Sequence, residues 1–221
     1  MTTTQKKRLM EATRKVTRMN DKAILKHLYP LISLVTRQRP LAAWPWLYFP
    51  YAKMFRRFKP GAHNVAQRCL PDENTNLVIE GPGSGGNHSF AAYFRKWNPS
   101  ERVSTLTHCA ATVRYAVKRG IPCVVLSRDI MGYINSHTKR FPHLYTPGVA
   151  ARCYTSFFLS VWDYRAGFVL AQLHEIIDRP DMVIRQINAQ FGTVFNAGDG
   201  LLPRIRVSEG DPNHGYEDDG K

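Results

Sequence analysis

Residues 77–90 have the sequence LVIEGPGSGGNHSF, in which a short apolar run leads into a glycine-rich loop. An apolar run that ends at a glycine cluster is typical of a buried β-strand entering a tight turn. In residues 91–97 (AAYFRKW), apolar side chains continue at helical spacing. We therefore expect a strand, a loop and then a helix whose N-terminus is directed at the loop.

A loop of this kind is suited to binding an anion, because unpaired backbone N–H groups and the helix dipole favour negative charge there. It is not the nucleoside-triphosphate loop, which requires Gly-Lys-Ser/Thr, since no lysine occurs between Lys59 and Lys96. Nor does it fit the dinucleotide fingerprint, because the next strand ends without an acidic residue that could hold a ribose. Alone, the loop is equally consistent with an ordinary strand–helix turn.

A second buried strand is predicted within residues 120–136 (GIPCVVLSRDIMGYINS). Arg128 follows this strand, and Ser136 lies on the helical segment after it. Because ligands collect at the carboxyl ends of parallel strands, Arg128 should share an edge with the glycine-rich loop. Arginine can hold a phosphate through two parallel hydrogen bonds. The alternative is a surface ion pair between Arg128 and Asp129, with Ser136 merely exposed.

Between these two segments, residues 102–108 (RVSTLTH) form a short alternating run that ends at His108. We expect this histidine to emerge at the same sheet edge as the loop and Arg128. Histidine is the side chain best suited to accept a proton near neutral pH. A structural or solvated histidine is the alternative.

In this order, the three segments resemble the sulfotransferases that use 3′-phosphoadenosine 5′-phosphosulfate. In that family a strand–loop–helix holds the 5′-phosphosulfate, and a strand ending in Thr-His supplies the catalytic base. A further strand ends in Arg-Asp, and the arginine binds the 3′-phosphate together with a serine eight residues later. Thr107-His108 and Arg128 with Ser136 match in residue type, order and spacing. The resemblance covers about residues 77–196 and is nearest to small bacterial and phage-borne members.

The resemblance implies transfer of a sulfuryl group from this donor to a hydroxyl or amine, with His108 as general base. It implies an α/β fold of the P-loop type, a three-layer sandwich with a central, mostly parallel sheet flanked by helices. No metal is required, and no metal-ligand spacing is present. The residues expected to bind the donor are Gly83, Ser84, Gly85, Gly86, Asn87, His88, Ser89, Arg128 and Ser136.

The loop departs from the family pattern at one position. The family usually carries a lysine or arginine there that contacts the transferring oxygens, whereas this chain has Ser84 or, with a one-residue shift, Gly83. Loss of a charged donor to a developing anion costs about 2–4 kcal/mol of transition-state stabilisation. We expect His88, at the start of the helix, to supply part of that function as a second catalytic residue. The alternative is a solvated loop histidine.

The length of 221 residues and the 43% hydrophobic content suit one α/β domain, which we place at residues 61–206. A basic, aromatic-rich extension precedes it at residues 1–60. An acidic tail, expected to be disordered, follows at residues 207–221. The four cysteines show no paired spacing and no secretory signal is recognisable, so we expect a cytoplasmic protein with reduced thiols.

Positive charge is concentrated in residues 1–60, which hold +12 of the net charge of +14. Within this extension, residues 40–59 place aromatic side chains beside basic ones. We rank a packed hydrophobic cover over the acceptor site first and peripheral contact with an anionic membrane second. Nucleic-acid binding ranks last and is not expected, because no recognition motif is present and a polyanionic donor already favours a positive protein field.

The sequence leaves the acceptor open among a small molecule, a sugar and a lipid, and it leaves the oligomeric state open. Two other functions remain. One is a P-loop nucleotide-binding phosphotransferase or hydrolase, which the missing lysine and the absent acidic magnesium partner argue against. The other is a non-catalytic protein that keeps the nucleotide fold for binding, which the altered loop favours.

Overall fold

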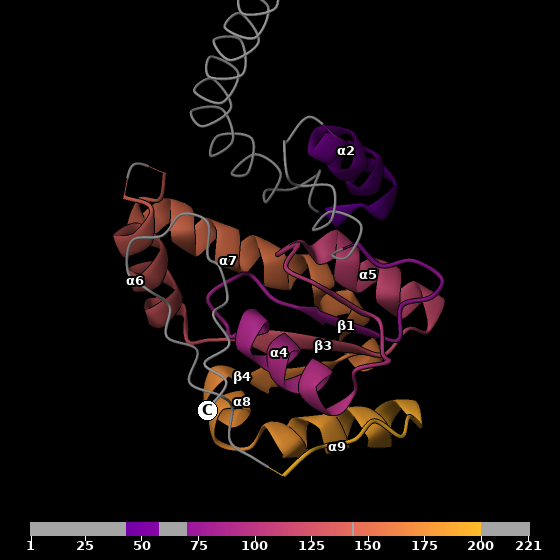
Figure 1. Ribbon diagram of the computed structural model, residues 1–221. Coiled ribbons are helices and arrows are strands. Elements are labelled where there is room, and N and C mark those ends of the chain that lie inside the picture. The colour runs from indigo at the N-terminus through magenta and orange to yellow at the C-terminus, as the bar shows by residue number, and fades with distance from the viewer. Residues whose placement is uncertain (1–42, 58–69, 143, 200–221) are drawn as a thin grey trace, which may run out of the picture.

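The computed structural model describes residues 43–57, 70–142 and 144–199. Within these ranges the strands form a single sheet, all parallel, in the order β2-β1-β3-β4 (Figure 1). The predicted α/β class is confirmed. The strands are β1 (Leu77–Glu80), β2 (Val103–Thr105), β3 (Cys123–Ser127) and β4 (Val169–Gln172).

Helices cover both faces of the sheet and make a three-layer sandwich (Figure 1). One face packs against α4, α8 and α9, and the other packs against α5 and α7. The helices are α2 (Pro45–Arg57), α4 (Asn87–Trp97), α5 (Ala110–Arg119), α6 (Ile130–Arg140), α7 (Pro147–Val161), the 3-10 helix η2 (Trp162–Gly167), α8 (Leu173–Asp178) and α9 (Pro180–Phe191).

The two central strands are buried on both faces, which explains their continuous apolar sequences. In β1, Leu77 and Ile79 join the core beneath α4 and α9, while Val78 joins the core beneath α5. In β3, Val124 and Leu126 face the first core. Because all the strands are parallel, the polar residues at their carboxyl ends lie at one edge of the sheet.

The strand order reverses at β1, because the chain passes from β1 to β2 on one side and then returns to β3 on the other. The loops that follow β1 and β3 therefore leave the sheet in opposite directions. In open α/β sheets the ligand crevice lies at such a switch point, outside the carboxyl ends of the strands. The glycine-rich loop follows β1 at this point.

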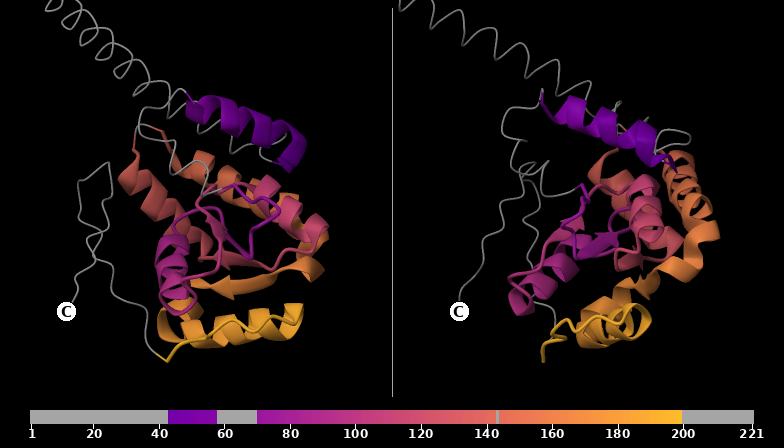
Figure 2. Two further views of the ribbon diagram at one scale, coloured as in Figure 1. Left: turned by 45° about the vertical axis from the view of Figure 1, so that its right-hand side comes forward. Right: turned by 90° about the vertical axis from the view of Figure 1, so that its right-hand side faces the viewer.

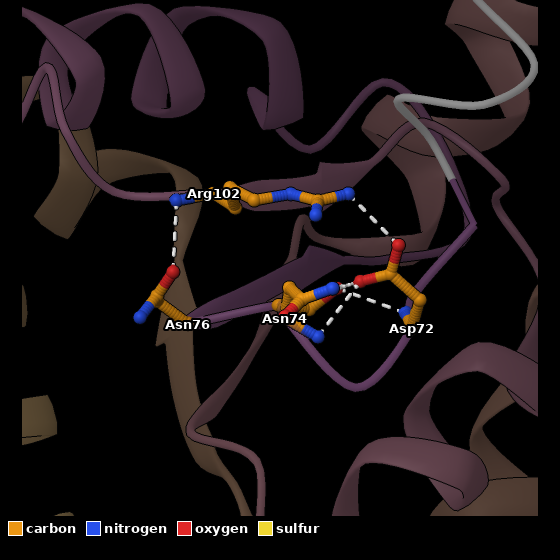
Figure 3. A network of polar contacts seen from close by, with 5 residues as sticks. Asp72, Asn74, Asn76 and Arg102 are labelled. Atoms are coloured by element: carbon orange, nitrogen blue, oxygen red, sulfur yellow. Dashed lines mark hydrogen bonds and ion pairs between the residues drawn. The ribbon is translucent and has the colours of Figure 1, made fainter.

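At the amino ends of the strands, a polar network joins the chain before β1 to the chain before β2 (Figure 3). The Asp72 carboxylate accepts hydrogen bonds from the Asn74 backbone and the Thr75 hydroxyl, and it lies 2.8 Å from the Arg102 guanidinium. The Asn76 side chain accepts from the Arg102 backbone N–H at 3.0 Å. These contacts fix the edge opposite to the loop.

Part of the aromatic stretch 40–59 packs against the α/β domain. In α2, Tyr48 and Ala52 are buried against Cys109 and Ala111. Both views of Figure 2 place α2 outside the layer formed by α5 and α7. The aromatic stretch is therefore at least in part a packed cover.

No helix within the described ranges is long and apolar enough to cross a membrane. Residues 1–42 of the predicted extension and the whole predicted tail, 207–221, lie outside the described residues.

Candidate functional site

The glycine-rich loop after β1 lies tightly between the end of β3 and the start of α8. A side chain at Gly81 would collide with the Leu126 carbonyl oxygen. Gly86, which caps α4, has φ of 86°, and a Cβ there would lie 2.5 Å from Ile176 of α8. Glycine at these two positions allows the loop to approach both neighbours and to enter α4 in a left-handed conformation.

Asn87 is the first residue of α4 and is only 3% exposed, yet neither polar atom of its amide has a hydrogen-bond partner among the described residues. The amide lies under the loop, since its Oδ1 is 3.3 Å and 3.6 Å from the places that Cβ atoms of Gly81 and Gly85 would take. A buried polar group without a partner costs about 1–3 kcal/mol. A polar ligand in this loop would supply such a partner.

Glu80, the last residue of β1, is fully buried and binds the chain that follows β2. Its Oε1 accepts from the Thr107 backbone N–H and hydroxyl, both at 2.8 Å, and its Oε2 accepts from the His108 N–H at 2.9 Å. Because the Thr107 hydroxyl donates to Glu80, the Thr112 hydroxyl at 2.7 Å donates to Thr107. Glu80 thus fixes His108 beside the loop.

Burial raises the pKa of the Glu80 carboxyl from its usual 4.5 to about 7, although the donors from Thr107, His108 and Gly81 lower it. Burial, with the nearby negative charge of Glu80, also raises the pKa of the Cys123 thiol. Glu80 therefore titrates near neutral pH at the base of the candidate site.

His108 lies three residues beyond the end of β2 and not within the strand, because the strand ends at Thr105. The ring Nδ1 donates to the Gly81 carbonyl at 3.2 Å, since a carbonyl oxygen can only accept. In the neutral ring this bond leaves the lone pair on Nε2, which is the form that a general base requires. The predicted meeting of His108 and the glycine-rich loop is observed.

Backbone strain is concentrated at the same edge. Among the described residues, the non-glycine positions with positive φ are Ser84 (52°), Leu106 (69°) and His108 (51°). Such conformations cost of order 1–3 kcal/mol each, so they persist only where contacts with the surrounding structure enforce them. All three lie in the loops that follow β1 and β2, so the strain coincides with the candidate site.

Ser136 on α6 donates a hydrogen bond to Ser84 in the loop, with 3.0 Å between the two hydroxyl oxygens. This contact joins two of the predicted donor-binding segments directly. The start of α6 is fixed by Asp129, whose carboxylate accepts from the Gly132 N–H at 2.6 Å. The helix therefore carries Ser136 to the loop after about two turns.

Arg128, immediately after β3, is held by its backbone, because its carbonyl accepts from the Tyr154 hydroxyl at 2.6 Å. Its side chain is 33% exposed, and its Nε lies 3.9 Å from the Asp129 carboxylate. The alternative ion pair is thus present, but Nε is buried and has no hydrogen-bond partner within the part of the chain that the structure describes. A ligand oxygen at this edge could accept the hydrogen bond that Arg128 Nε is able to donate.

His88 and Ser89 are the second and third residues of α4. His88 is exposed and Ser89 is half-buried. Hydrogen bonds from His108 and Ser136 reach the loop at Gly81 and Ser84. The structure thus groups the loop with His108 and Ser136, while His88 lies on the outer side of the helix.

Two residues at this edge are not among the predicted site residues, although His137 belongs to a basic cluster after Ser136 that the sequence places within possible reach of the 3′-phosphate or the acceptor. Glu80 could have been noticed as an acid at the end of an otherwise apolar strand. His137 follows Ser136 and is only 4% exposed. Its ring stacks on Tyr133, four residues earlier, with centroids 3.9 Å apart. That spacing is the sequence signal for the stack.

Among the described residues, no group of three or more His, Cys, Asp or Glu side chains is placed to hold a metal ion. Comparisons with protein-family models, with curated proteins and with solved structures find no match. The fold and site define an α/β protein with a glycine-rich loop at the switch point of its sheet.

Proposed function

We propose that this protein is a sulfotransferase that moves a sulfuryl group from 3′-phosphoadenosine 5′-phosphosulfate to a hydroxyl or amine acceptor. One observation carries the proposal: both other candidate segments are hydrogen-bonded to the glycine-rich loop. His108 donates to Gly81, and Ser136 donates to Ser84. The base and the donor-binding serine that the family resemblance requires thus converge on one loop.

The polar groups at this edge suit a polyanionic donor. The Asn87 amide and the Arg128 Nε are buried and have no hydrogen-bond partners in the described ranges. The N-terminal amides of α4, an 11-residue helix, add a partial positive charge. Arg128 and Ser136 would hold the 3′-phosphate, and the backbone amides of Gly85, Gly86 and Asn87 would hold the 5′-phosphosulfate.

In the proposed reaction, His108 accepts the proton of the acceptor hydroxyl at Nε2 while the acceptor oxygen forms its bond to sulfur. The bond between sulfur and the bridging oxygen of the 5′-phosphate breaks, and adenosine 3′,5′-bisphosphate leaves with the electron pair. His108 later releases the proton to water. Glu80 and Gly81 keep the ring in the tautomer and position that this step needs.

Calorimetry with adenosine 3′,5′-bisphosphate tests the donor class. We expect binding at micromolar strength, and weaker binding of ATP with magnesium. A preference for ATP with magnesium would contradict the proposal and favour a phosphotransferase or hydrolase.

The substitution His108→Asn tests the base, because asparagine tolerates the left-handed backbone but cannot accept the proton. With radiolabelled donor and a metabolite extract as the source of small-molecule, sugar and lipid acceptors, we expect transfer to fall by about 10²–10⁴-fold. Binding of adenosine 3′,5′-bisphosphate should persist. An unchanged rate would remove His108 from the mechanism, and binding without any transfer by the unmodified chain would favour a non-catalytic protein.

A further inference from the structure

We infer that His137 supplies the cation that the glycine-rich loop lacks, by donating a hydrogen bond from Nε2 to the phosphosulfate anion held at Gly83 and Ser84. This inference rests on the proposed function and adds a residue to it. His137 lies on α6 beside Ser136, far from the loop in sequence, so the loop pattern alone could not indicate it.

The geometry places His137 against both positions at which the resemblance expects a charged side chain. Its Nε2 and Cε1 lie 3.3 Å and 3.5 Å from the place that a Cβ of Gly83 would take. Its Nδ1 lies 3.5 Å from the Ser84 hydroxyl. His108 also lies near this point, with Cγ 3.9 Å from it. Two imidazole rings therefore lie close to Gly83.

The hydrogen bonds of His137 indicate which protonation state would serve an anion. Nδ1 is 3.1 Å from the Tyr133 carbonyl, so Nδ1 is the donor of that bond. In a neutral ring Nε2 would then carry a lone pair directed toward the loop, which repels an anion. The imidazolium donates from both nitrogens, so an anion at Gly83 favours the charged form. Ligand binding should therefore be accompanied by proton uptake.

Aromatic neighbours hold this ring in place. Tyr133 stacks on it with centroids 3.9 Å apart, and Tyr145 meets it edge to face at 5.1 Å. Ring faces also stabilise a cation, by about 0.5–2 kcal/mol. His88, by contrast, is exposed on α4. Burial, fixed orientation and contact with Gly83 favour His137 over His88 as the substitute for the missing cation.

Other ionisable groups surround His137 and enter the design of the test. On α6, on α7 and in the connection between them these are Tyr133, Tyr145, Cys153 and Tyr154, which lie in one cluster. Burial and the charge of Asp129 raise the pKa of Tyr154. Near Gly83 lie His108 and, hydrogen-bonded to the His108 backbone, Glu80, whose pKa burial raises to about 7. The charged residues on or beside α6 are Arg128, Asp129, Lys139 and Arg140.

The experiment uses the full chain with the substitution His137→Phe, which keeps a ring to stack on Tyr133 and removes both donors. Calorimetry of adenosine 3′,5′-bisphosphate binding in two buffers of different ionisation enthalpy measures proton uptake. We expect uptake by the unmodified chain near pH 7.5 and a clear decrease in His137→Phe. The kcat/KM for the sulfuryl donor should fall by about 10²-fold. Lys139→Met is the matched control, because it removes an exposed cation from the same helix.

The outcomes separate the two claims. If the unmodified chain does not bind adenosine 3′,5′-bisphosphate, the proposed function and this inference both fail. If it binds and transfers while His137→Phe matches it in rate and proton uptake, this inference alone fails. Equal losses of kcat/KM and proton uptake in His137→Phe and Lys139→Met would assign the effect to the electrostatic field of the positive charges on α6. That result would also overturn the inference. If the circular dichroism spectrum shows that His137→Phe does not fold, the proton-uptake measurement is repeated with His137→Gln, which is a smaller change of side chain.

Discussion

At the scale of single residues, Glu80 has the most direct effect on both stability and site geometry. Its carboxyl lies fully buried, and the donors around it belong to Gly81, Thr107 and His108. These donors favour the carboxylate, whereas burial favours the protonated acid. Burial has the larger effect, so the pKa is raised to about 7. The same hydrogen bonds position His108, so Glu80 couples folding to the candidate site.

We predict that Glu80 makes the free energy of unfolding fall as pH rises from about 4.5 to about 7. In this window the native state holds a proton on Glu80 that the unfolded state has lost, so stability decreases with pH. The shift corresponds to a loss of at most about 3 kcal/mol. Urea unfolding of the unmodified chain and of Glu80→Gln, measured from pH 4 to pH 8, checks this.

Glu80→Gln should be less stable than the unmodified chain at every pH, because one backbone donor loses its acceptor. The stability of Glu80→Gln should also lack the pH dependence that the Glu80 proton contributes. The difference in unfolding free energy between the two chains isolates Glu80, because every other ionisable group is present in both chains. That difference should shrink as pH rises through the window. A difference independent of pH would contradict the prediction.

At the scale of elements, Gly132 in the first turn of α6 leaves space for the Arg128 side chain. A Cβ at Gly132 would lie 2.5 Å from the Arg128 Nε and 2.5 Å from the Asp129 carboxylate. Both atoms belong to the ends of flexible side chains that can move aside. The absence of a side chain at Gly132 therefore lets the guanidinium lie against the first turn of α6.

We predict that Gly132→Ala separates binding from stability. Alanine gains up to about 1 kcal/mol of helix propensity over glycine, so the melting temperature should hold or rise. Displacement of Arg128 should weaken binding of adenosine 3′,5′-bisphosphate by about tenfold, the loss expected for one charged hydrogen bond. Calorimetry and thermal unfolding measure the two effects, with the exposed Asn135→Ala on the same helix as control. Unchanged affinity would place Arg128 outside the donor site.

The same elements show what the sequence can and cannot predict. The strand, loop and helix at 77–97 were predictable because burial on both faces and glycine spacing are local signals. The sequence predicts only the edge of the sheet at which His108 lies. Its exact position depends on a hydrogen bond to Glu80, 28 positions away in the sequence. The contact of His137 with Gly83 depends on how α6 packs. Local pattern therefore identifies the elements, and tertiary packing selects which histidines meet.

At the scale of the whole molecule, the N-terminal aromatic stretch and the α/β domain are packed together. Tyr48 of α2 is buried against Cys109, the residue that follows His108. Trp44 stacks over the Arg114 guanidinium at 4.2 Å, whereas Trp46 is 68% exposed. Part of the stretch thus serves packing, which leaves the surrounding positive charge to be explained separately.

Residues 1–60 contribute +12 to a net charge of +14, and we predict that this charge attracts the polyanionic donor. The KM for the donor should rise several-fold when salt is raised from about 0.02 M to about 0.2 M, because the screening length shortens from about 20 Å to below 10 Å. The kcat should change little, since groups in direct contact with the ligand are screened less. A KM independent of salt, together with cosedimentation of the chain with vesicles rich in anionic lipid, would contradict steering and assign the charge to a membrane surface.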